Sequence, residues 1–81
     1  MKSKKELSKY WLVLIVEGEN DTKTENMLHS TNNLEALSSV ISFYSSRVND
    51  KVHLEVWEAI TYDAFDMPDE YKVIKEVKRN A

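Results

Sequence analysis

The sequence predicts a small α+β domain in which one helix packs on a mainly antiparallel sheet of three or four strands. Three observations lead to this prediction. Residues 10–17 form an apolar run rich in β-branched and aromatic side chains. Residues 33–48 carry an apolar stripe at helical spacing, and in residues 51–62 apolar side chains alternate with more polar ones. The 81 residues suffice for a single domain, residues 1–81. The expected order is β-β-α-β, followed by a C-terminal segment that is either strand or helix.

The first strand is predicted at residues 10–17. Both of its faces are apolar, with one formed by Trp11, Val13 and Ile15 and the other by Tyr10, Leu12, Leu14 and Val16. A strand that is apolar on both faces belongs inside a sheet and is covered, at least in part, on both sides. Residues 22–29 follow a turn and contain little apolar material beyond Met27 and Leu28. Residues 22–29 are therefore predicted to form a weak edge strand.

The helix is predicted at residues 33–48, with Asn32 as the N-cap and Glu35 completing a capping box. Its apolar stripe recurs every three or four residues and consists of Leu34, Leu37, Ile41, Tyr44 and Val48. The serines between these positions are only moderate helix formers. We therefore expect packing on the sheet, rather than intrinsic propensity, to hold the helix.

A second firm strand is predicted at residues 51–62, with one buried and one wetter face. The buried face carries Val52, Leu54, Val56 and Ile60, and the wetter face carries His53, Glu55, Trp57 and Ala59. Residues 63–70 are predicted to form an acidic loop. Residues 71–79 fit a strand because they are rich in β-branched side chains. They also fit a helix, because the spacing of their apolar residues would place them on one helical face. The terminal residues 1–8 and 80–81 are expected to be flexible.

The chain contains no cysteine, one glycine and one proline. These counts exclude disulfides, thiolate metal sites, thiol nucleophiles and glycine-rich phosphate loops. Small secreted domains usually carry disulfides, so a reducing, cytoplasmic location is expected. The longest apolar run, residues 11–16, is too short for a bilayer span or a signal peptide. No membrane association is expected.

The two histidines, His29 and His53, are far apart in the sequence and do not by themselves predict catalysis. His53 and Glu55 share a strand face, but they would bind a metal only if the fold supplied a third ligand. The carboxylates in residues 63–70 lack the alternating spacing and the glycine of a calcium loop. We therefore expect a non-enzymatic protein with no catalytic residue, no metal ligand and no cofactor.

Large aromatic side chains and a methionine stand beside carboxylates in residues 57–70, a combination typical of interaction surfaces. An unpaired sheet edge could also take a strand from a partner or from a second copy. The sequence thus predicts a protein-interaction module that regulates or inhibits a larger protein. Its predicted contact residues are Trp57, Tyr62, Phe65, Asp66, Met67, Asp69 and Glu70. The alternative is that Phe65 and Met67 close the end of the core. The abundance of Lys, Asn, Ile, Glu and Ser favours a phage or mobile-element origin.

The net charge of −3 is unevenly distributed along the chain. Residues 1–10 and 71–81 each carry a net charge of +3, and residues 11–70 carry −9. If the two basic ends lay on one side, they would form a positive patch with Tyr10, Trp11 and Tyr71 available to stack on bases. The alternative function is therefore that of a nucleic-acid-associated accessory protein, although the acidic body would repel phosphate.

Overall fold

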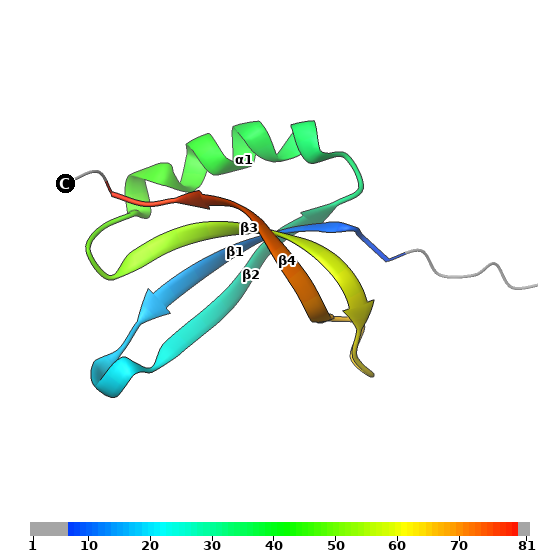
Figure 1. The fold of residues 1–81 in the computed structure, drawn as a ribbon. Coiled ribbons are helices and arrows are strands. Elements are labelled where there is room, and N and C mark those ends of the chain that lie inside the picture. Colours follow the sequence, from blue (N-terminus) through cyan, green and yellow to red (C-terminus); the bar gives the residue numbers. More distant parts are fainter. Residues whose placement is uncertain (1–6, 80–81) are drawn as a thin grey trace, which may run out of the picture.

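The computed structural model describes residues 7–79. Four strands form one antiparallel sheet in the order β2-β1-β3-β4, and helix α1 lies across one of its faces (Figure 1). The strands are β1 at Tyr10–Glu17, β2 at Lys23–Thr31, β3 at Val52–Tyr62 and β4 at Pro68–Val77. Helix α1 spans Leu37–Tyr44, with 3₁₀ turns at Leu34–Ala36 and Ser45–Arg47. The α+β prediction is confirmed, and the order is ββαββ.

Strand β1 lies between β2 and β3, as its two apolar faces predict. Leu12 and Val13 point to opposite faces, and both are fully buried. On the helix face, Leu12 packs with Leu37, Leu54 and Val56. On the opposite face, Val13 packs in a second cluster with Ile15 and Trp57. The sheet therefore has a packed apolar cluster on each side.

The C-terminal segment is a strand, which settles the choice that the sequence left open. Strand β4 pairs with β3 and forms one outer edge of the sheet, while β2 forms the other and confirms the predicted edge strand. The predicted acidic loop is too long, because β4 already begins at Pro68 and includes Asp69 and Glu70. Proline is tolerated there because the first residue of an edge strand need not donate to the ladder.

The helical segment is capped by Asn33 rather than by the predicted Asn32. The Asn33 side chain accepts a hydrogen bond from the backbone N–H of Glu35 (3.1 Å). Asn32 instead accepts one from the backbone N–H of Lys9 (2.8 Å), just before β1. The helix is also shorter than predicted, since its last turn tightens to 3₁₀ and Val48 is extended.

No helix within residues 7–79 has the length and apolar character needed to cross a bilayer. The prediction of flexible ends falls mostly on residues 1–6 and 80–81, which lie outside the described residues. Immediately before β1, the carbonyl of Ser8 accepts hydrogen bonds from the Trp11 indole and from the Tyr62 hydroxyl. The Trp11 bond is local to the start of β1, and the Tyr62 bond attaches the residues before β1 to the end of β3.

Candidate functional site

The face of β3 that points away from α1 is buried, so the prediction of a wetter face is wrong. Trp57 is 1% exposed and His53 is 7% exposed. The reason lies in a neighbouring strand: Tyr71 of β4 stacks on Trp57, with ring centroids 3.6 Å apart and planes at 7°. Trp57 is therefore a core residue. It is not available as a contact for a partner, which corrects its place among the predicted contact residues.

Glu55 lies between His53 and Trp57 along this buried face. Its Oε2 accepts a hydrogen bond from Nε2 of His53 (2.9 Å), and its Oε1 accepts one from Nε1 of Trp57 (2.8 Å). Burial acts to raise the pKa of the Glu55 carboxyl, but these hydrogen bonds and the nearby positive charge of Lys23 outweigh it and hold the pKa below the ordinary value. Glu55 is thus an ionised carboxylate with both oxygens in use.

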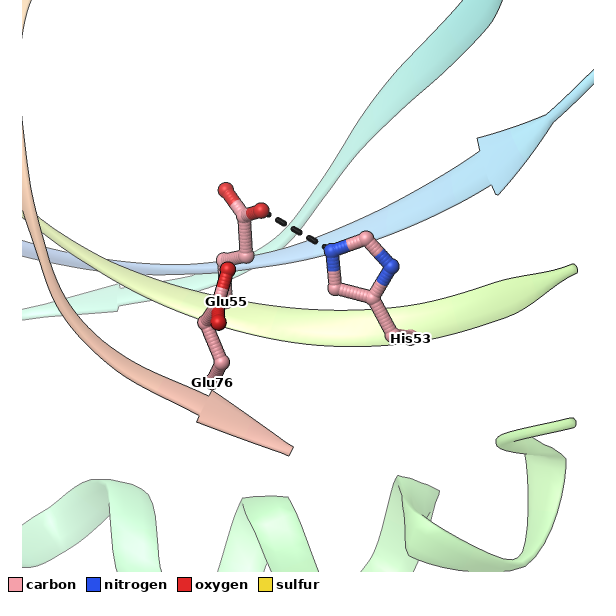
Figure 2. Close-up of side chains that lie close together, drawn as sticks. All are labelled: His53, Glu55 and Glu76. Atoms are coloured by element: carbon pink, nitrogen blue, oxygen red, sulfur yellow. Dashed lines mark hydrogen bonds and ion pairs between the residues drawn. The ribbon is translucent and has the colours of Figure 1, made fainter. Parts of the chain in front are cut away.

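Glu76 of β4 is the cross-strand partner of Glu55. Figure 2 shows Glu76 reaching from β4 toward the His53–Glu55 pair of β3. One ligand atom from each of the three side chains lies within 4.8 Å of the other two. The Glu76 side chain is 46% exposed and forms an ion pair with Lys78 (3.6 Å). One imidazole and two carboxylates in this arrangement could hold a metal ion. The sequence indicated that His53 and Glu55 would bind a metal only if the fold supplied a third ligand, and Glu76 of β4 is in the position to be that ligand.

Nearby carboxylates also affect Tyr71, the β4 residue whose ring covers Trp57 on this face. Burial raises the pKa of the Tyr71 hydroxyl, and the negative charges of Glu25 and Glu55 raise it further. The Tyr71 phenol therefore remains protonated at neutral pH. The carboxylate cluster and the stacked rings form one continuous site on the side of the sheet opposite α1.

The other predicted contact residues gather at the turn between β3 and β4. Phe65 is 84% exposed at this turn. The Asp63 carboxylate shapes it by accepting hydrogen bonds from the backbone N–H groups of Phe65 (2.8 Å) and Met67 (3.1 Å). Asp66 adopts the left-handed backbone conformation, with φ of 63°. Asp69 and Glu70 are exposed, whereas Tyr62, Asp66 and Met67 are half-buried.

Exposed apolar side chains are concentrated on this β3–β4 hairpin. Of the seven exposed large apolar residues within the described part of the chain, two, Leu34 and Phe43, belong to the helical segment. The five on the hairpin are Ile60, Phe65, Tyr71, Val73 and Ile74. A cleft of about 270 Å³ separates the hairpin from α1, with Leu37, Ile41 and Ile74 among its lining. The hairpin thus carries most of the exposed large apolar side chains of the described residues.

The basic residues next to the sheet do not form one patch. Strands β1 and β4 are both antiparallel to β3, so the start of β1 and the end of β4 lie at opposite ends of the sheet (Figure 1). Lys9 forms an ion pair with Glu58 (3.3 Å), and Arg79 forms one with Asp50 (3.0 Å). The remaining basic residues of the N-terminal end, at positions 2, 4 and 5, lie outside the described residues. Nucleic-acid binding stays a prediction.

Comparisons with protein-family models, with curated proteins and with solved structures find no match to this chain. Function is therefore inferred from the fold, from the cluster of His53, Glu55 and Glu76, and from the exposed apolar residues of the β3–β4 hairpin.

Sequence reasoning missed the Glu55–Glu76 pairing and the burial of Trp57 for one reason. Both depend on β4 lying beside β3, and the sequence did not decide between strand and helix there. The His53–Glu55 alternation was the available signal, and it identified two of the three clustered residues.

Proposed function

We propose that this chain is a small non-enzymatic module that binds another protein through its β3–β4 hairpin and thereby regulates or inhibits that protein. The observation that carries this proposal is the position of Phe65, which is 84% exposed at the turn between the two strands. Burying a side chain of this size against a partner contributes about 1.5–3 kcal/mol.

The turn supports the proposal because it presents Phe65 in a defined position. Asp63 accepts two backbone hydrogen bonds from within the turn, including one from Phe65 itself. Asp63 N–H also donates to the carbonyl of Met67 (2.8 Å), which closes the hairpin. A turn held in this way loses little conformational entropy on binding, so more of the contact energy appears as affinity.

The charge around Phe65 favours a basic partner. The carboxylates of Asp69 and Glu70 are exposed on the neighbouring part of β4. Opposite charge across an interface accelerates encounter and discriminates against acidic proteins. Because these carboxylates are in contact with water, added salt should weaken the complex mainly through its association rate.

The free edge of β4 extends the same surface. Strand β4 pairs with β3 on one side, and its other side is an outer edge of the sheet. Tyr71 and Val73 add apolar area along this edge. A partner that contacts Phe65 could also add a strand to β4, a common mode of peptide recognition.

Two matched variants test the proposal. Phe65→Asp places a charge in the proposed contact, and Phe43→Asp places the same charge on α1, where Phe43 is 69% exposed. Immobilised wild-type chain and both variants are incubated with a lysate of the organism that encodes the chain, and captured proteins are quantified by mass spectrometry. We expect one protein to be retained by wild type and Phe43→Asp and lost with Phe65→Asp.

The captured protein is then purified and titrated against each variant by calorimetry. A loss of at least about tenfold in affinity is expected for Phe65→Asp, since removal of one buried apolar contact of 1.4 kcal/mol or more has this effect. Equal affinities for Phe65→Asp and wild type, with both folded by circular dichroism, would remove the basis of the proposal.

A further inference from the structure

We propose that His53, Glu55 and Glu76 bind one divalent metal ion of the zinc class, with a fourth position open to water. The site joins β3 to β4 on the side of the sheet away from α1 (Figure 2). The site belongs to the same two strands as the proposed contact surface but is separate from the turn that presents Phe65, because none of its three residues lies in that turn.

The distances suit a tetrahedral ion. When metal–ligand bonds are about 2.0–2.2 Å, neighbouring ligand atoms of a tetrahedral ion lie about 3.3–3.6 Å apart. Nε2 of His53 and Oε2 of Glu55 are 2.9 Å apart, close to this separation. The three ligand atoms lie within 4.8 Å of one another, so the Glu76 carboxylate must approach by about 1.5 Å at most. The half-exposed Glu76 side chain can make this change through its rotamers.

The two inner ligands are held in place before any ion arrives. His53 and Glu55 side chains are 9% and 14% exposed, so packing restricts their rotamers. The Trp57 indole donates to the second oxygen of Glu55 (2.8 Å) and thereby orients the carboxylate. Outer hydrogen bonds of this kind typically change metal affinity by about 10–100-fold when they are removed. Because the Glu76 side chain is exposed, an ion can reach the site from the solvent on that side.

The two carboxylates of the site also favour a cation. Glu55 and Glu76 are directly opposite each other on adjacent strands, a placement that is unfavourable for like charges. The ion pair between Glu76 and Lys78 is a solvent-exposed contact of 3.6 Å, which an ion of higher charge can displace. A divalent ion would neutralise both carboxylates at once.

Metal binding requires the lone pair on Nε2 of His53, so the ring proton must reside on Nδ1 in the bound form. His53 also lines a second cleft of about 180 Å³, together with Glu17, Asn49 and Asp50. These polar groups and the water that reaches them can solvate the Nδ1–H. The mixed nitrogen and oxygen ligand set favours zinc or cobalt over the hard cations calcium and magnesium.

The chain has two histidines, which allows a sharp test with untagged protein. Chelator-treated protein is titrated with Zn²⁺ by calorimetry, and imidazole resonances are followed by NMR. We expect one ion per chain and shifts at His53 without shifts at His29. Glu76→Gln should weaken binding at least about tenfold through loss of one charged ligand. Because Glu76 is half-exposed, this variant should remain folded.

Two controls complete the experiment. Glu58→Gln alters a carboxylate on the other face of β3, and His29→Asn alters an exposed histidine of β2, so neither should change the affinity. Calcium and magnesium should bind at least about tenfold more weakly than zinc. The proposal is overturned if Zn²⁺ does not bind at millimolar concentration, if Glu76→Gln binds as wild type does, or if His29→Asn is the variant that loses binding.

Discussion

Replacing Trp57 with phenylalanine removes the indole donor while keeping an aromatic ring in the buried position. The lost hydrogen bond runs from Nε1 to the Glu55 carboxylate (2.8 Å), and bonds to charged acceptors contribute about 1.5–3 kcal/mol. The narrower ring also leaves part of the space against Tyr71 unfilled, because the two rings are stacked at 3.6 Å. We therefore expect Trp57→Phe to lower the free energy of unfolding by about 2–4 kcal/mol. A domain of this length has about 4–12 kcal/mol in total.

Trp11→Phe is the matched control for this measurement. The Trp11 indole also donates through Nε1, but to the neutral carbonyl of Ser8 (3.0 Å), and its ring is half-buried. Its expected cost is about 0.5–1.5 kcal/mol. Urea titrations followed by far-ultraviolet circular dichroism give both values without relying on tryptophan fluorescence. Equal losses for the two variants, or a loss below about 1 kcal/mol for Trp57→Phe, would refute the assignment of Trp57 and Glu55 to a buried, coupled pair.

Three further predictions concern the cap, the turn and the buried carboxylate. Asn33→Ala should cost about 0.5–2 kcal/mol by removing the bond to the Glu35 N–H, as measured by urea titration against Asn33→Asp, which keeps the acceptor. Asp63→Ala should increase amide hydrogen exchange at Phe65, because the Asp63 carboxylate accepts a hydrogen bond from the Phe65 N–H; unchanged exchange would contradict the described turn. For Glu55, the native pKa lies below its ordinary value of 4.5, so its stabilising effect is present above that pH and is lost as the pH falls through the lowered native pKa. The stability difference between wild type and Glu55→Gln, measured in chelator, should therefore shrink as the pH is lowered below 4.5; a difference that does not change with pH would contradict it.

The central strand and the helix could be predicted because their patterns are local. A run of apolar residues on both faces places β1 inside the sheet, and a stripe that includes Leu37 and Ile41 places α1 on it. These assignments need no knowledge of the neighbouring elements. The capping residue was missed by one position, because Asn32 and Asn33 are equivalent as caps until the end of β2 fixes where the chain turns.

Strand β4 could not be predicted because its pattern is interrupted. Ile74 has no partner on β3, since Lys75 pairs with Val56 and Val73 pairs with Trp57. A bulge of this kind shifts the alternation by one residue, so neither strand nor helix periodicity fits the whole segment. The candidate metal ligands and the burial of Trp57 depend on this strand and its register. They become visible only once the pairing is known.

The order of pairing in the sheet has a consequence for how the chain folds. β1–β2 and β3–β4 are hairpins between strands adjacent in the sequence, whereas β1–β3 joins Trp11 to Trp57 across the whole helical connection. Loop closure over such a separation has an entropic cost that the hairpins largely avoid. The two hairpins can therefore form early and independently, and docking of β1 on β3 is expected to limit the folding rate. Substitutions at Val13 or Leu54 should slow folding, whereas changes in the β3–β4 turn should mainly alter the rate of unfolding.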